Sequence, residues 1–170
     1  LMFPDTRSRS AALFNRARAV QPGANTRHMI TFSPYVIYAD RGSGCRVTDV
    51  DGNRFIDWVN NFSTNIHGYG YPPIVEAIKA QADRMLSCIL PTEAEIELSE
   101  IITDRWPAID QVRFTNSGTE AVMVAVKAAR AITGRSKIAK TEGGYHGQFD
   151  LVEASFLPNP ANWGPEDRPA

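Results

Sequence analysis

Two hydroxyl residues flank a glycine at Ser117, Gly118 and Thr119, directly before a run of small and apolar residues that predicts a helix. The first N–H groups of a helix lack partners within it, and the helix dipole favours negative charge there. Gly118 lets a ligand approach the backbone closely, so these residues predict a phosphate site. The alternative is that Ser117 only caps its helix together with Glu120. The spacing matches neither a P-loop nor a GxGxxG fingerprint.

A second loop, 142–147, places Tyr145 and His146 among three glycines. Its backbone freedom would present an aromatic face and an imidazole to a flat ring. The alternative is a glycine-rich surface loop with a packed tyrosine and a histidine that has no role. If the two loops meet over one ligand, that ligand has a phosphate at one end and a ring at the other.

The elements that would position both loops form a strand, a helix and a second strand. Val112–Thr115 predicts the first strand, the helix follows Ser117 and ends at Gly134, and Lys137–Thr141 predicts the second strand. Such a βαβ unit has parallel strands and a right-handed crossover. Because ligands bind beyond the carboxyl ends of parallel strands, we expect both loops at one edge of a sheet.

The residues before this unit predict a helix, an antiparallel meander and two further helices. Apolar residues at helical spacing up to Val20 predict the first helix, and Pro22-Gly23 stops it. An Asp51-Gly52 turn lies within the meander. The remaining signals are strands at Tyr35–Ala39, Cys45–Thr48 and Arg54–Trp58, and helices beginning at Pro73 and at a Thr92 capping box.

The composition is that of a soluble globular chain of 170 residues, 43% hydrophobic and 22% charged. The 18 basic and 19 acidic residues leave a net charge of -1, which argues against broad nucleic-acid binding. We expect no membrane span and no signal peptide, and hence a cytoplasmic protein. The cysteines, Cys45 and Cys88, have no CxxC spacing, and the three histidines have no paired-ligand spacing, so we expect free thiols and no metal site.

Several spaced motifs resemble the fold-type I, class III aminotransferases that use pyridoxal 5'-phosphate. More narrowly, they resemble the branch of glutamate-1-semialdehyde aminomutase and the β-amino-acid aminotransferases. The motifs occur in the family's order between about residues 20 and 155. The segments that carry the resemblance are Pro22–Arg27, Val47–Asp57, Pro91–Glu93, Phe114–Ala121, Ala131–Ile138 and Glu142–Gly147.

The resemblance assigns roles to seven residues. Ser117, Gly118 and Thr119 match the loop that holds the cofactor phosphate, Tyr145 matches the aromatic residue stacked on the pyridine ring, and His146 follows it in the same site. Two further residues match the substrate side, Arg27 as a partner for the substrate carboxylate and Phe62 beside the ring. For Arg27 the alternative is an exposed arginine after a turn, and the sequence around Phe62 departs from the aminomutase pattern.

The resemblance implies an α/β fold, the N-terminal part of a fold-type I transferase. A small α+β portion at 1–72 precedes the start of a mainly parallel-sheet cofactor domain at 73–155, and 156–170 is an irregular proline-rich loop. In the family, the Schiff-base lysine and the pyridinium aspartate follow the Tyr-His loop. We therefore expect both beyond residue 170, and no catalytic residue among residues 1–170. Family members are homodimers, so we expect exposed apolar surface here.

The function that this resemblance predicts is transfer of an amino group between an amino acid, possibly a β-amino acid, and a keto acid. The first alternative is glutamate-1-semialdehyde 2,1-aminomutase. Residues 155–163 differ from the Gly/Ser-rich lid segment of the aminomutases, which favours transamination. The second alternative is a non-catalytic fragment or module that binds a phosphate ligand without the lysine.

Overall fold

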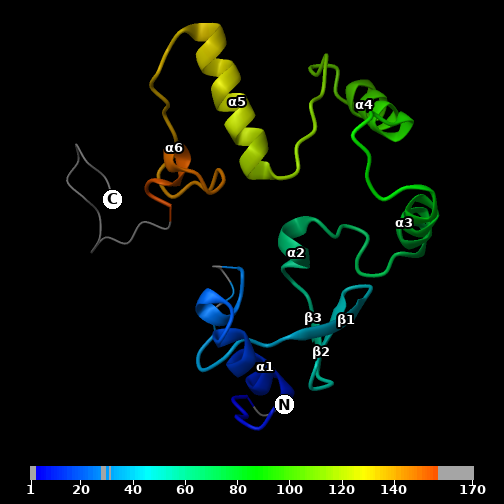
Figure 1. Ribbon diagram of the computed structural model, residues 1–170, viewed down its shortest axis with the longest axis vertical. Helices are drawn as coiled ribbons and strands as arrows, with labels where there is room; N and C mark the ends of the chain where they lie inside the picture. The colour runs from blue at the N-terminus through cyan, green and yellow to red at the C-terminus, as the bar shows by residue number, and fades with distance from the viewer. Residues whose placement is uncertain (1–2, 28–29, 31, 157–170) are drawn as a thin grey trace. The chain divides into compact units, whose positions relative to one another are not determined.

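The computed structural model describes residues 3–27, 30 and 32–156 (Figure 1). It divides into two compact units, Leu1–Ile89 and Leu90–Ala170. The family domain boundary that we predict after residue 72 stays a prediction, and most of the predicted proline-rich loop lies outside the described residues.

The first unit begins with helix α1 (Arg9–Arg18), as its apolar spacing predicts. The Ser8 hydroxyl caps this helix by accepting from the N–H of Ala11 at 3.1 Å. A short 3-10 turn, η1 (Pro22–Ala24), follows where Pro22-Gly23 predicts the end of the helix. Ala11, Ala24, Tyr35 and Val36 form the buried apolar centre of this unit.

An antiparallel meander of order β1-β2-β3 follows, as predicted. Its strands are β1 (Ala39–Ser43), β2 (Arg46–Asp49) and β3 (Arg54–Ile56). The predicted first strand is displaced, because Tyr35 packs beside the start of α1 and its hydroxyl donates to the carbonyl of Asp5 at 2.9 Å. The 35–38 stretch therefore packs against the N-terminal segment, and the strand pairing begins at Ala39.

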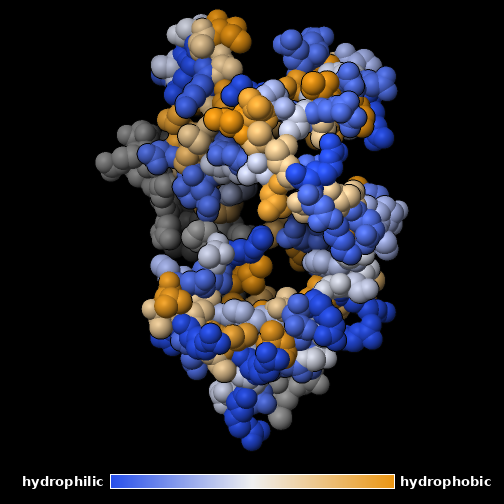
Figure 2. Space-filling model, turned by 45° about the vertical axis from the view of Figure 1, so that its right-hand side comes forward, coloured by the Kyte–Doolittle hydropathy of each residue, from blue (hydrophilic) through white to orange (hydrophobic). Residues whose placement is uncertain are grey.

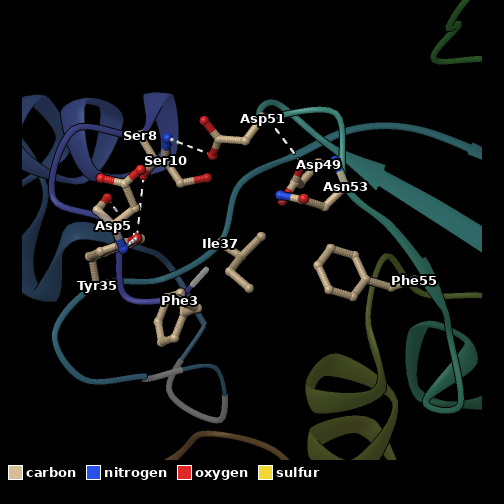
Figure 3. Close-up of a pocket in the computed structure, with 10 residues that line it drawn as sticks. All are labelled: Phe3, Asp5, Ser8, Ser10, Tyr35, Ile37, Asp49, Asp51, Asn53 and Phe55. Carbon is tan, nitrogen blue, oxygen red and sulfur yellow. Dashed lines mark hydrogen bonds between the residues drawn. The ribbon is translucent and has the colours of Figure 1, made fainter. Parts of the chain in front are cut away.

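The Asp51-Gly52 turn between β2 and β3 is confirmed, and Gly52 has the positive φ of +84° that such a turn requires. The turn also caps α1, because the Asp51 carboxylate accepts from the N–H groups of Arg9 at 2.6 Å and Ser10 at 3.1 Å. Figure 3 shows the bond from Ser10. The Ser10 side chain, chiefly, holds the pKa of Asp51 below its usual value. A hairpin turn thus supplies acceptors to a helix start about forty residues earlier.

Two helical segments complete the first unit. The helix α3 (Pro72–Arg84) starts with prolines in its first turn, as predicted. Before it, α2 (Asn60–Ser63) is a single turn in which all four residues have positive φ, between 49° and 65°. A left-handed turn of non-glycine residues costs about 1–2 kcal/mol per residue, so its neighbours must hold it in place.

The second unit contains α4 (Glu93–Arg105), α5 (Gly118–Thr133) and α6 (Asp150–Glu153). Gly134 ends α5 in the left-handed conformation, as predicted. The Thr92 capping box is wrong in detail, because the backbone carbonyl of Thr92, and not its hydroxyl, accepts the N–H of Glu95 at 3.2 Å.

The two predicted strands of the βαβ unit are unpaired segments in the described part of the chain. Residues 112–115 and 137–141 flank α5, but no ladder joins them to each other or to another strand. A strand forms only with a hydrogen-bonded neighbour, and the described residues of this unit offer none. The order of segment, helix and segment is as predicted, whereas the parallel pairing is not formed.

Many large apolar side chains are exposed in both units. Figure 2 shows apolar residues interspersed with charged ones on the visible face. Trp58, Leu86 and Ile89 are 88%, 86% and 99% exposed. Among the described residues, no helix has the length and hydropathy needed to cross a membrane.

Candidate functional site

The N-terminus of α5 has the backbone donors that an anion site requires. The Ser117 hydroxyl accepts from the N–H of Glu120 at 3.2 Å, and the Glu120 carboxylate accepts from the N–H of Asn116 at 2.7 Å. Within the described residues, the N–H groups of Gly118 and Thr119 have no acceptor. An added Cβ at Gly118 would meet nothing within 4 Å, so the space beside these donors is open. Capping and anion binding are therefore compatible, because they use different N–H groups.

The two predicted loops meet at Thr119. Its hydroxyl accepts from the backbone N–H of Gln148 at 3.2 Å. Gly147 is buried, with φ at +103°, and an added Cβ would lie 2.8 Å from the Cα of Thr119. Only a glycine permits this approach without a shift of the backbone. The two loops are thus in contact, although the strands predicted before them are unpaired among the described residues.

In the loop 142–147, the side chains of Tyr145 and His146 lie in different surroundings. The Tyr145 ring is 56% exposed and contacts the Phe156 ring, with 4.9 Å between centroids. The His146 imidazole folds back over Gly144, where an added Cβ would lie 2.7 Å from Nε2. One aromatic face is thus free to cover a ring, and the imidazole lies over the loop's own backbone.

Contacts with the following segment hold the base of this loop. The N–H of Gly143 donates to the carbonyl of Ser155 at 3.0 Å, and Lys140 Nζ donates to the carbonyl of Ala154. Lys140 is therefore engaged with the backbone of this segment.

Arg27 lies in the first unit, and its side chain is exposed. The Asn25 side chain orders this turn, because Oδ1 accepts from the N–H of Arg27 at 2.7 Å and Nδ2 donates to the carbonyl of Ile30 at 3.2 Å. The guanidinium has no ion-pair partner in the described part of the chain. A hollow of about 270 Å³, lined partly by Arg27, Ile30 and Tyr38, lies beside it.

Phe62 sits in the left-handed turn α2 and is 53% exposed. Asp57 holds this turn, because its Oδ1 accepts from the N–H groups of Val59 and Asn60, both at 2.9 Å. Its Oδ2 accepts from the Tyr69 hydroxyl at 2.6 Å. The carboxylate thus links the turn to Tyr69, which also pairs with the sheet.

The bond between Asp57 and Tyr69 shifts both pKa values. The Tyr69 hydroxyl, chiefly, lowers the pKa of Asp57, and the Asp57 carboxylate raises the pKa of Tyr69. The Tyr69 backbone forms a bridge with Gly44, and its ring packs where a side chain on Gly42 would otherwise lie. The turn that carries Phe62 is therefore tied to the meander.

The sequence prediction missed three of these residues. Gln148 acts through its backbone N–H, which no side-chain pattern reveals. The link between Asp57 and Tyr69 spans twelve residues, and the only local signal was an aspartate just before a turn.

The class-III aminotransferase model matches residues 30–155, which is most of the chain. The chain belongs to the class-III aminotransferase family. This match contains both loops at Thr119, and the fold-type I class predicted from the sequence agrees with the solved neighbours.

Three similar proteins indicate the range of this aminotransferase family. A glutamate-1-semialdehyde 2,1-aminomutase of Methanothermobacter thermautotrophicus is 46% identical over 85% of the chain and 34% of its own length. An omega-transaminase from Sphaerobacter thermophilus is 48% identical, with a TM-score of 0.89 over 96% of the chain and 37% of its own. A beta-phenylalanine aminotransferase from Variovorax paradoxus is 35% identical, with a TM-score of 0.79 over 82% of the chain and 32% of its own.

The chain spans between a third and two fifths of the length of the relatives it matches. Family membership follows from the match itself.

Proposed function

We propose that this aminotransferase chain moves an amino group between an amino acid and a keto acid with pyridoxal 5'-phosphate. The observation that carries the proposal is the junction at Thr119, where the open helix start and the Tyr-His loop come together. One ligand with a phosphate and a flat ring fits that pairing, and the cofactor of this family has both.

The donor set at α5 fits the cofactor's phosphate. The N–H groups of Gly118 and Thr119 have no acceptor among the described residues, and the dipole of a helix of 16 residues favours an anion there. The Thr119 hydroxyl accepts from Gln148, so its own hydrogen is available to donate to a phosphate oxygen. Ser117 keeps this helix start in place as its cap.

The exposed face of Tyr145 would cover the pyridine ring, and Phe156 supports the tyrosine from one side. When bound, the cofactor supplies an electron sink for the carbon that exchanges its amino group. The described residues bind and orient the cofactor. A lysine for covalent attachment is expected outside these 170 residues.

For the substrate, we propose that Arg27 binds a carboxylate and that Phe62 takes part in substrate binding, as the resemblance implies. Support comes from the turn at Asn25, which orders the Arg27 backbone, and from a guanidinium without an acidic partner in the described part of the chain. A planar guanidinium suits a carboxylate, whether the amino group is on the α or the β carbon. The resemblance to β-amino-acid aminotransferases favours a substrate with its amino group on the β carbon.

The aminomutase remains the alternative, because a relative with that name is as similar as the omega-transaminase. The two activities differ in product, since the mutase needs no keto acid and returns the amino group to the same molecule. Assays with and without a keto acid acceptor separate them.

The second alternative is a module that binds a phosphate ligand without catalysis.

A homodimer in the cytoplasm is the assembly and location that we propose for the enzyme. The many large apolar side chains exposed in both units support association, since an interface would remove them from water.

The test is to express the complete reading frame with pyridoxal 5'-phosphate and record the visible absorption of the bound cofactor. Borohydride reduction followed by peptide mapping should trap one lysine, and β-amino acids should give amino transfer to a keto acid. Cofactor binding without a trapped lysine or transfer would support the binding module. Absence of both the absorption band and a trapped lysine would overturn the proposal.

A further inference from the structure

One face of the meander carries three arginines around a single threonine. Strand register places Arg41 opposite Thr48 and Thr48 opposite Arg54, so all three side chains share a face. Arg46 lies two residues before Thr48 on the same strand and therefore joins them. The guanidinium groups come from three different strands.

These side chains surround a hollow of about 200 Å³, whose lining also includes Gly42 and Ser43. All three arginines are exposed, whereas Thr48 is only 9% exposed and lies among them. Its hydroxyl has no hydrogen-bond partner within the part of the chain that the structure describes. An unpartnered hydroxyl thus lines a hollow surrounded by positive charge.

The positive charge of this face is only partly balanced. The Arg41 guanidinium bonds the Asp40 carboxylate at 2.7 Å, and both side chains of this pair are exposed. Arg46 and Arg54 have no acidic partner among the described residues. Like charges on one sheet face repel, and a bound anion would relieve that repulsion.

We propose that this arginine face binds a compact anion with one or two phosphate groups. Guanidinium groups match phosphate oxygens in bidentate geometry, and the hydroxyls of Thr48 and Ser43 can add donors. The hollow is of a size for a small anion, and a net charge of -1 for the whole chain does not favour a long nucleic acid. None of these residues belongs to the phosphate loop of α5, so the site is independent of the proposed catalytic function.

The test uses the complete protein saturated with pyridoxal 5'-phosphate, so that the α5 site is filled. Inorganic diphosphate is titrated calorimetrically at two salt concentrations. The double variant Arg46→Gln/Arg54→Gln should bind diphosphate about tenfold or more weakly, because it loses the charge-assisted bonds. Thr48→Val should weaken binding by about tenfold, as expected for the loss of one hydrogen bond to a charged acceptor.

A matched control, Arg84→Gln/Arg113→Gln, removes the same charge from exposed positions outside this face. It should bind like the wild type. Equal weakening in the control, or unchanged affinity in the Arg46→Gln/Arg54→Gln variant, would overturn the proposal. So would absence of diphosphate binding at millimolar concentration, or binding of an acidic peptide alone. Circular dichroism of each variant checks that the meander is intact. The variant Arg54→Lys keeps the positive charge but loses the bidentate guanidinium, so its affinity for diphosphate should lie between those of the wild type and of Arg46→Gln/Arg54→Gln.

Discussion

The Thr119 hydroxyl accepts a hydrogen bond from the backbone N–H of Gln148 at 3.2 Å, 29 residues further along the chain. This bond joins the start of α5 to the loop that carries Tyr145. Because Gly147 packs against the same threonine, the joint depends on both a hydroxyl and the lack of a side chain. Both features can be tested separately.

Replacing Gly147 with alanine should separate the two loops. The added Cβ would meet Thr119 at 2.8 Å, and the positive φ adds backbone strain of about 1–2 kcal/mol. We expect cofactor affinity of the complete protein to fall by about tenfold or more, measured from the absorption of bound cofactor.

Gly134→Ala is the matched control, since Gly134 also has a positive φ but its added Cβ meets nothing within 4 Å. It should lower the melting temperature and leave cofactor affinity close to that of the wild type. Equal loss of affinity in both variants would show that strain alone, and not the junction, explains the effect.

Thr119→Val keeps the shape of the side chain and removes the acceptor for Gln148. The Gln148 amide should then exchange its hydrogen on the order of tenfold faster, because its hydrogen bond is lost. Thr119→Ser retains the hydroxyl and should restore protection. If the amide exchanges at the same rate in Thr119→Val as in the wild type, the bond does not hold the loop.

Asp51 should make the stability of α1 depend on pH. Its pKa is lowered on folding, so its contribution is present above the usual value of 3.8 and is lost as the pH falls through the folded pKa. Asp51→Asn should therefore melt earlier than the wild type at pH 7, and the gap should narrow at low pH, as the Asp51 carboxylate of the folded protein is protonated. Thermal melts followed by circular dichroism measure this.

The control for that series is Asp110→Asn, which changes an exposed carboxylate in the loop after α4. Its melting difference from the wild type should be small at both pH values. A gap for Asp51→Asn that persists unchanged at low pH would contradict the capping role of the carboxylate.

Tyr69 should ionise late in a phenolate titration. Asp57 raises the pKa of this tyrosine, so the hydrogen bond stabilises the fold below pH 10 and is lost as the pH rises through the folded value. The difference spectrum between the wild type and Tyr69→Phe isolates this group. In an Asp57→Asn background, the ionisation of Tyr69 seen in the same difference spectrum should occur at lower pH.

Asp83→Asn, in α3, serves as the control and should leave that titration unchanged. If Asp57→Asn also leaves it unchanged, the carboxylate does not control Tyr69. Amide exchange at Val59 and Asn60 should rise in Asp57→Asn, because their acceptor weakens.

The elements with local signals were the predictable ones. Gly134 and the Ser117 cap bound α5 as expected, because both devices act within one helical turn. The order of segment, helix and segment around α5 was predicted correctly. The pairing of the two segments as parallel strands was not, since a strand depends on neighbours that are distant in the sequence. The meander was predicted from its Asp51-Gly52 turn, although its first strand begins later because Tyr35 bonds to Asp5.

The candidate site divides in the same way. The hydroxyls at Ser117 and Thr119 and the glycines around Tyr145 were visible as residue types. The link between Asp57 and Tyr69 and the left-handed turn at Phe62 were not, because they arise from backbone donors and a contact across twelve residues. The arginine face was hidden as well, since it appears only when the register of three strands is known.

The cap that Asp51 provides to α1 also bears on the order in which this chain acquires structure during synthesis. The ribosome releases residues 9–18 well before residue 51 emerges, so the helix first meets water with only the Ser8 hydroxyl as its cap. A helix of ten residues is marginal in isolation. Residues 9–18 are thus expected to become helical late, although they are made before the hairpin that completes their first turn.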